Sequence, residues 1–229
     1  LTISNRDPVV SGTAITPTNV FTASEVSCNA SVSDDDGESI TATYEWFVAG
    51  NSIGAGATLT LSTSLVSVGD SLTCTVSATD GYGGSHFEDA TTTILNTDPT
   101  VDSVSIDLST PVVSDVLTCS ASGSDMDGDT PGYSFLWSNL TTGEVYTSTT
   151  TNTDSVTLDL STTNVSVDDE VECMVVASDS DGGSDSDMAT VTIYNSAPQF
   201  DVAASIDINP YVYVDDVLTC SANASDLND

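Results

Sequence analysis

The chain has 229 residues and carries one Lys or Arg against 35 Asp and Glu, a formal net charge of −34. A surface this negative excludes nucleic acid and anionic membrane as electrostatic partners. The acids repel one another unless salt or bound cations neutralise them. The charge therefore fits two interpretations, a solvated surface suited to saline surroundings and a set of sites for divalent cations.

An internal repeat organises the sequence. Each of the five cysteines is followed six residues later by an aspartate. Cys119 follows Cys28 by 91 residues (119 − 28), and Trp137 follows Trp46 by the same interval (137 − 46). Repeats of about 90 to 100 residues are whole small domains rather than solenoid units. The five cysteine–aspartate pairs are Cys28/Asp34, Cys74/Asp80, Cys119/Asp125, Cys173/Asp179 and Cys220/Asp226.

The period predicts four segments. Residues 1–6 are the last strand of a preceding repeat, 7–97 are repeat 1, 98–196 are repeat 2, and 197–229 open a third repeat. We interpret the sequence as a window on a longer repetitive chain. No signal peptide or membrane-inserted segment is visible within this window. The alternative is strand exchange between chains at true termini.

In chain order, apolar residues alternate with polar ones at period two between Gly, Asn, Asp and Pro, which predicts strands and almost no helix. The sequence thus predicts an all-β fold. The expected buried sets of repeat 1 are Val26, Cys28 and Ala30, then Tyr44, Trp46 and Val48, then Leu59 and Leu61, then Leu72, Cys74 and Val76. Those of repeat 2 are Leu117, Cys119 and Ala121, then Tyr133, Phe135 and Trp137, then Val156, Leu158 and Leu160, then Val171, Cys173 and Val175.

A cysteine strand, a tryptophan eighteen residues later (46 − 28 and 137 − 119) and a second cysteine strand resemble the immunoglobulin sandwich. The resemblance implies tandem Ig-like antiparallel β-sandwiches, each with a disulfide between its second and sixth strands, arranged as beads in a rod or filament. It implies the pairs Cys28–Cys74 and Cys119–Cys173, and a partner outside the sequence for Cys220. The alternative is five free buried thiols. Leu72 and Val171 stand where immunoglobulin domains carry a tyrosine, which indicates a divergent family.

More closely, the chain resembles the tandem Ig-like, cadherin-like or PKD-like repeats of very large secreted bacterial and archaeal surface proteins. The resemblance rests on three N-x-x-P junctions that begin at Asn5, Asn96 and Asn195, and on the loops Ser124–Asp129 (SDMDGD) and Ser178–Gly183 (SDSDGG). The PKD motif W-x-F-G-D-G is missing. The resemblance and the disulfide pattern imply an extracellular or cell-surface location.

Acidic loops supply the candidate metal ligands. In an Ig-like sandwich the loops after the second and sixth strands lie at the end where the linker enters, so their carboxylates gather there. Calcium takes six to eight oxygens from such groups, and we expect it as the cofactor. The loop at Asp125 is not an EF-hand, because Leu136 stands where a glutamate is required. The expected ligands are Asn5, Asp7, Asp34, Asp36 and Asp80 in repeat 1; Asn96, Asp98, Asp125, Asp127, Asp129, Asp179 and Asp181 in repeat 2; and Asn195, Asp226 and Asn228 in the third.

Other motifs are few. Glycosylation sequons stand at Asn29, Asn139, Asn164 and Asn223, a number that chance accounts for. The one histidine, His86, is expected in the second acidic loop of repeat 1, and no catalytic motif accompanies it. The sequence therefore predicts a protein that is not an enzyme.

The expected function is an extracellular structural one, a surface fibre, filament or stalk stiffened by cations at the domain junctions. The expected partners are neighbouring repeats and other copies of the chain. Two alternatives stay open, a cell-surface adhesin that binds a glycan or protein, and accessory repeats of a larger secreted enzyme. Exposed aromatics that favour adhesion are sparse, with Tyr82, Phe87, Tyr211 and Tyr213 as the candidates.

Overall fold

The computed structural model describes residues 4–151, 153–207 and 211–226. These residues form strands and one short 3-10 helix, η1 (Leu160–Thr162). Two compact units are distinguished, residues 1–100, 124–131 and 178–184 in the first and residues 101–123, 132–177 and 185–229 in the second. Among the described residues no helix has the length and apolar character needed to cross a membrane.

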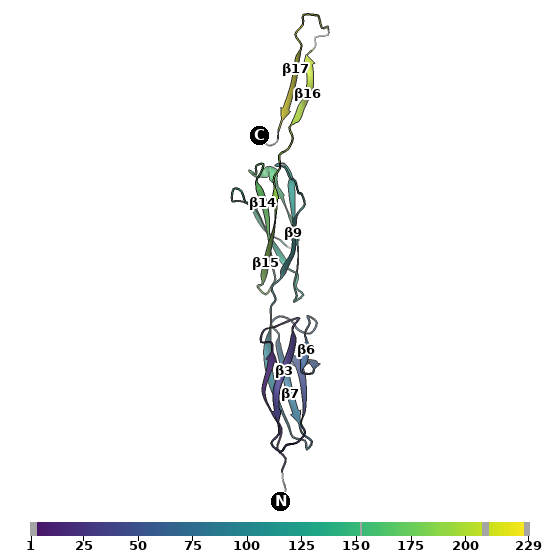
Figure 1. Ribbon diagram of the computed structural model, residues 1–229, viewed down its shortest axis with the longest axis vertical. Helices are drawn as coiled ribbons and strands as arrows, with labels where there is room; N and C mark the ends of the chain where they lie inside the picture. Colours follow the sequence, from purple (N-terminus) through teal and green to yellow (C-terminus); the bar gives the residue numbers. More distant parts are fainter. Residues whose placement is uncertain (1–3, 152, 208–210, 227–229) are drawn as a thin grey trace. The chain divides into compact units, whose positions relative to one another are not determined.

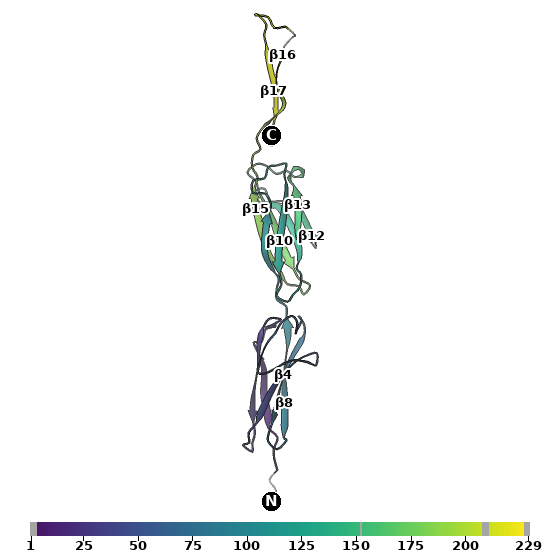
Figure 2. The same cartoon turned by 90° about the vertical axis from the view of Figure 1, so that its right-hand side faces the viewer.

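The first sandwich consists of two sheets in the first unit (Figure 1). One has the strand order β1 (Val9–Thr16), β3 (Glu25–Ser33), β6 (Thr58–Thr60). The other has the order β2 (Val20–Phe21), β8 (Ser85–Leu95), β7 (Ser71–Thr79), β4 (Thr41–Val48), β5 (Asn51–Ala55), with β2 parallel to β8. Figure 2 shows β4 and β8, two strands of this second sheet.

The period-two pattern explains which side of each strand is buried. In β7, Leu72, Cys74, Val76 and Ala78 are buried, whereas the residues between them are partly exposed. Alternation places successive side chains on opposite faces of a sheet, so one face of β7 packs on the core and the other meets solvent. The predicted strand pattern of repeat 1 is confirmed at this strand.

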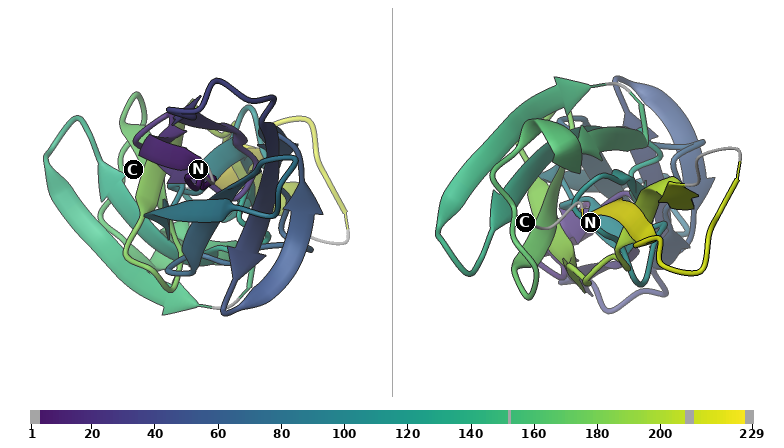
Figure 3. Two further views of the ribbon diagram at one scale, coloured as in Figure 1. Left: turned by 90° about the horizontal axis from the view of Figure 1, so that it is seen from below. Right: turned by 90° about the horizontal axis from the view of Figure 1, so that it is seen from above.

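The second sandwich repeats the plan. One sheet has the order β13 (Ser155–Asp159), β10 (Val116–Ser124), β9 (Thr100–Ile106), and the other has the order β12 (Glu144–Thr151), β11 (Gly132–Asn139), β14 (Glu170–Ser178), β15 (Ser184–Thr192). The loops 124–131 and 178–184, which follow β10 and β14, are grouped with the first unit. Figure 3 shows the sheets along their strands.

Each sandwich has a disulfide in its core, as the resemblance implied. Cys28 and Cys74 are bonded with a Cα–Cα distance of 6.3 Å, and Cys119 and Cys173 with 6.4 Å. The two pairs join the opposing sheets of their sandwiches, which is the Ig-like arrangement. The fold is therefore all-β, with tandem Ig-like sandwiches that each carry this cross-link.

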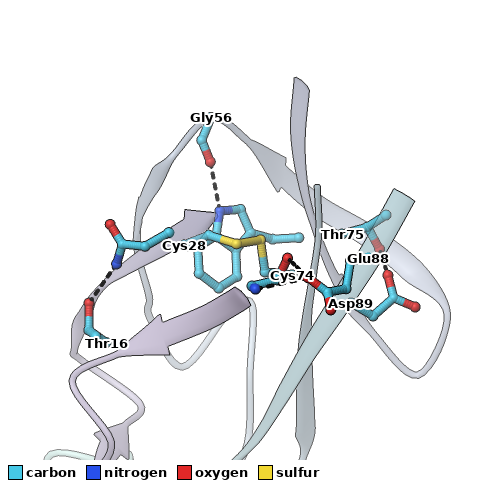
Figure 4. The surroundings of a disulfide bond; sticks show 10 residues. Thr16, Cys28, Gly56, Cys74, Thr75, Glu88 and Asp89 are labelled. Atoms are coloured by element: carbon cyan, nitrogen blue, oxygen red, sulfur yellow. Dashed lines mark hydrogen bonds between the residues drawn. A yellow bond between two sulfur atoms is a disulfide. The ribbon is translucent and has the colours of Figure 1, made fainter. Parts of the chain in front are cut away.

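A fully buried tryptophan packs in each core, but the two indoles differ in hydrogen bonding. Trp46 lies opposite Cys74 in the strand register, and its Nε1 donates to the carbonyl oxygen of Gly56 at 2.9 Å; Figure 4 shows Gly56 and the Cys28–Cys74 bond. Trp137 Nε1 is buried and has no partner among the described residues. The two cores therefore differ at the indole N–H, which is hydrogen-bonded in the first sandwich and lacks a described acceptor in the second.

The start of the third repeat is a two-stranded antiparallel sheet, β16 (Gln199–Asp207) and β17 (Thr219–Ser225). Ile206 pairs with Cys220 in it, as Ile15 pairs with Cys28 in the first sandwich. The Cys220 thiol is exposed and free. That its partner lies outside this sequence stays a prediction.

Candidate cation sites in the acidic loops

Three carboxylates meet at one end of the first sandwich. Asp34 and Glu38 lie in the loop after β3, and Asp80 begins the loop between β7 and β8. One oxygen from each of the three lies within 4.8 Å of the others. The segment Asn5–Asp7, which precedes β1, joins them: Asn5 Nδ2 donates to Asp80 Oδ2 at 2.9 Å.

Hydrogen bonds fix the orientation of these side chains. Asp34 Oδ1 accepts from the backbone N–H of Asp36 at 2.8 Å, and Asp80 Oδ1 accepts from the N–H groups of Tyr82 and Gly84, both at 2.8 Å. The backbone N–H of Arg6 donates to Asp36 Oδ2 at 2.7 Å. Asp36 thus holds the incoming segment, while Asp34 and Asp80 each turn one oxygen to the loop backbone and keep the other for the cluster.

A glycine keeps the centre of the cluster open. A Cβ atom on the buried Gly84 would stand 2.8 Å from Asp7 Oδ1 and in still closer contact with Asp80 Oδ2. Real Cβ atoms do not approach oxygens so closely, so any other residue displaces at least one of these carboxylates. The same contact places Asp7, a predicted ligand, beside Asp80.

The electrostatics of the first cluster are those of crowded anions. Burial, followed by the charges of Asp80, Asp34 and Asp36, raises the pKa of Glu38 above its usual range. The hydrogen bond from the Asn5 amide, helped by loop N–H groups, lowers the pKa of Asp80. The buried atoms Asp34 Oδ2 and Glu38 Oε2 have no hydrogen-bond donor among the described residues. A cation is the group that such oxygens can bind.

The second cluster repeats the first. Its linker and first loop follow their counterparts by 91 residues (96 − 5 and 125 − 34), and its second loop follows by 99 residues (179 − 80). Asn96 Nδ2 donates to Asp179 Oδ2 at 2.9 Å, as Asn5 does to Asp80. The backbone N–H of Thr97 donates to Asp127 Oδ2 at 2.6 Å, as Arg6 does to Asp36. The same hydrogen bonds are therefore made twice by equivalent residues.

The loop geometry is also duplicated. Asp125 Oδ1 accepts from the backbone N–H of Asp127 at 2.6 Å, and Asp179 Oδ1 accepts from the N–H groups of Asp181, Gly182 and Gly183 at 2.7–2.8 Å. A Cβ atom on Gly183 would stand 2.7 Å from Asp98 Oδ1 and closer still to Asp179 Oδ2. Gly183 thus has the same steric role as Gly84.

Two oxygens of the second cluster lack donors among the described residues, Asp125 Oδ2 and Asn96 Oδ1, and both are buried. Burial is the main cause that raises the pKa of Asp125. The backbone N–H of Asp127 opposes it, and the charges of Asp127, Asp129 and Asp179 add to it. The Asn96 amide lowers the pKa of Asp179. Asp127 accepts a further hydrogen bond. The buried hydroxyl of Thr22, which belongs to the same compact unit, donates to Asp127 Oδ1 at 2.6 Å.

The structure separates the predicted residues into groups. Asn5, Asp7, Asp34 and Asp80, and equally Asn96, Asp98, Asp125 and Asp179, are brought together. Asp36 and Asp127 hold the linker backbone, and Asp129 and Asp181 are exposed. The amide of Asn195 donates to the carbonyl of Ser196 at 2.8 Å, Asp226 is partly buried, and Asn228 lies outside the described residues.

Sequence reasoning missed Glu38. It lies 91 residues before the predicted ligand Asp129 (129 − 38), so the period carried the signal. The predicted ligands are all aspartate or asparagine, whereas this one is a glutamate.

His86 lies in β8 rather than in the loop where the sequence analysis placed it. Its Nδ1 accepts the backbone N–H of Val10 at 3.1 Å, which fastens β1 to β8. Asp185 Oδ2 accepts from Val101 at 2.9 Å at the equivalent place of the second sandwich. The histidine thus has a structural role that a carboxylate performs in the other copy.

The sequons differ in access. Asn29, Asn164 and Asn223 are exposed. Asn139 is 1% exposed, donates to Tyr146 Oη and Asp169 Oδ2, and accepts from the backbone N–H groups of Thr141 and Thr142. A glycan on Asn139 is incompatible with this packing, so Asn139 is excluded as one of the four possible glycosylation sites of the folded chain.

No protein-family model and no curated protein matches the chain. Among solved structures, it is similar to Sidekick-1 immunoglobulin domains 1–5, with 14% identity, a TM-score of 0.41, and coverage of 98% of this chain and 46% of that one. It is also similar to a two-domain fibronectin type III segment from chicken tenascin (9% identity, TM-score 0.43, 80% and 98% covered) and to fibronectin(III)-like modules of Clostridium thermocellum CbhA (18%, 0.33, 80% and 94%). The fold assignment rests on the sheets and disulfides of the chain itself.

Proposed function

We propose that the chain is a non-enzymatic extracellular structural segment whose Ig-like repeats build a surface filament or stalk, with calcium at the acidic loops. The observation that carries the proposal is that the linker and the two acidic loops make the same hydrogen bonds in both copies. In both copies a linker asparagine and a linker backbone N–H bind the two acidic loops, and the matching oxygens Asp34 Oδ2 and Asp125 Oδ2 have no donor in the described part of the chain.

The oxygen set suits calcium. Asp34 Oδ2, Glu38 Oε2, Asp80 Oδ2 and Asp7 Oδ1 would hold the ion in the first site. Asp125 Oδ2, Asn96 Oδ1, Asp98 Oδ1 and Asp179 Oδ2 would hold it in the second. Calcium tolerates irregular sets of six to eight oxygens, and backbone carbonyls and water complete such a shell. Calcium bound there joins the linker to both loops and cancels their mutual repulsion.

Disulfides support the extracellular assignment, because they form and persist in oxidising surroundings. The resemblance to secreted bacterial and archaeal surface repeats supports the structural role, with neighbouring repeats and other copies of the chain as partners. Adhesion is the second candidate. It is favoured by the side chains of Tyr82 and Phe87, which are 77% and 65% exposed on the first sandwich.

Calcium titration of Asp34→Asn and Asp125→Asn tests the sites. Each substitution should remove calcium binding at one cluster and leave the other. Asp89→Asn is the matched control, since the Asp89 carboxylate accepts the Thr75 hydroxyl at 2.7 Å, between the paired strands β7 and β8 and away from both acidic loops. Equal calcium binding by all three variants would refute the sites.

Electron microscopy of a chain of several repeats tests the mechanical role. We expect straight filaments in calcium and flexible ones after chelation. Filaments whose bending stiffness is indifferent to the chelator would return the acidic loops to a role in solvation alone.

A further inference from the structure

A groove opens between the two sheets of the second sandwich, with a cavity volume of about 620 Å³. One wall is β12, which contributes Glu144, Tyr146 and Thr147; the other is β13 with the segment after it, which contributes Leu158, Asp159 and Asn164. All of these residues belong to the second compact unit.

Both walls are edge strands. In the described part of the chain β12 pairs with β11 alone, and β13 with β10 alone. The outer side of an edge strand presents backbone N–H and C=O groups that form no ladder, and such an edge accepts a further strand. The groove therefore offers main-chain hydrogen bonds as well as side chains.

The equivalent strands of the first sandwich approach each other closely beside the tryptophan. Gly54 lies opposite Trp46, and a Cβ atom there would stand 2.8 Å from Leu59 Cδ1. Thr147 lies opposite Trp137 at the equivalent position, and Leu158 takes the place of Leu59 in the strand register. Gly54 leaves room for Leu59 in the first sandwich, whereas Thr147 and Leu158 line the groove in the second, where the tryptophan and the leucine are 21 residues apart (158 − 137) and not 13 (59 − 46).

The charge of the groove selects its occupant. Glu144 and Asp159 flank it, and none of its lining residues is basic. A second copy of the chain is a poor occupant, because its one basic side chain, Arg6, is paired with Asp35 at 2.9 Å. We propose that the groove binds an extended segment of a different protein, which carries Lys or Arg at alternate positions and adds to β12 as an antiparallel or parallel strand.

The probe is an eight-residue peptide of alternating lysine and valine, added to the full chain. We expect binding by calorimetry and slowed amide hydrogen exchange confined to β12. Because the chain attracts any cation, the control is the same peptide N-methylated at every residue, which keeps the charge but has no backbone N–H to donate to β12. It should bind at least about tenfold more weakly, as several backbone hydrogen bonds are lost.

A charge variant localises the site. Glu144→Gln should weaken the binding of the peptide by about two- to fivefold, which is the effect expected from losing one exposed ion pair. Glu170→Gln, the matched control, removes an equal charge from a residue that does not line the groove and should have no effect. Equal affinity for the N-methylated peptide, exchange protection elsewhere than β12, or binding of a neutral hexasaccharide in place of the peptide would each overturn the proposal.

Discussion

Replacing the two core tryptophans by phenylalanine should have unequal effects on stability. Trp46 and Trp137 are both fully buried beside a disulfide, so Trp46→Phe and Trp137→Phe remove the same volume from similar cores. The two tryptophans differ in the hydrogen bonding of the indole nitrogen. Trp46 Nε1 donates to Gly56 O, whereas Trp137 Nε1 has no acceptor among the described residues.

The size of the difference follows from hydrogen-bond energetics. Trp46→Phe loses a net hydrogen bond of about 1 kcal/mol and leaves the Gly56 carbonyl without this partner. Trp137→Phe instead removes a buried unpaired donor, whose burial costs about 1–3 kcal/mol. Trp46→Phe should therefore be more destabilising than Trp137→Phe by about 2–4 kcal/mol.

Native-state hydrogen exchange of the full chain measures this difference, because the amides of β7 report on the first sandwich and those of β14 on the second. Tryptophan fluorescence is unsuitable, since each variant removes the reporter of its own sandwich. Equal losses of protection at β7 and β14 would refute the assignment of Trp137 Nε1 as an unpaired donor.

The remaining predictions concern the cross-links, a buried network, an ionised side chain and the two glycines. Cys28→Ala with Cys74→Ala should lower the unfolding free energy by about 4 kcal/mol on the chain-entropy account of a 46-residue separation, measured by urea unfolding against the intact chain. Asn139→Ala should cost about 2–3 kcal/mol, because the buried Asp169 carboxylate loses a donor at 2.8 Å, and exchange at β14 checks it. The pKa of Glu88 is lowered first by the backbone N–H of Thr13 and next by the Thr13 hydroxyl, so the stabilisation by Glu88 is present above its unfolded pKa and is lost as the pH falls through its folded pKa. Glu88→Gln should therefore flatten the acid limb of the stability profile below the usual pKa of a glutamate. Gly84→Ala and Gly183→Ala should each abolish calcium binding at their own cluster while the disulfide cores stay folded, whereas Gly81→Ala, with open space around the added Cβ, is the silent control.

Much of this architecture could be predicted from the sequence because its signals are local or periodic. The alternation around Cys74 predicts a strand with one buried face, and the 91-residue interval predicts that Asn96 repeats whatever Asn5 does. The hydrogen bonds at 2.9 Å from both asparagines to Asp80 and Asp179 agree with that interval.

What the sequence could not provide depends on which atoms meet. Asn139 belongs to a sequon, yet its burial depends on Tyr146 and Asp169, whose approach no local pattern encodes. His86 looks like a loop residue until the strand register places it opposite Ala78, where it reaches Val10. The tryptophan motif is the same in both repeats, yet Trp46 Nε1 has an acceptor and Trp137 Nε1 has none among the described residues.

The disulfides and the acidic loops stabilise different parts of each repeat. Each of the four bonded cysteines lies in the buried middle of a strand, and the aspartate six residues later lies beyond the strand's end, where the linker arrives. A disulfide restricts the unfolded chain but does nothing to relieve repulsion among carboxylates at 4.8 Å. A bound cation relieves that repulsion but leaves the core unchanged. Reduction and chelation should therefore act independently: reduction should lower exchange protection in β7 and β14, and chelation should lower it in the loops and in segments 5–7 and 96–98. A chelator effect that appears only after reduction would show that the loops are ordered by the core and not by cations.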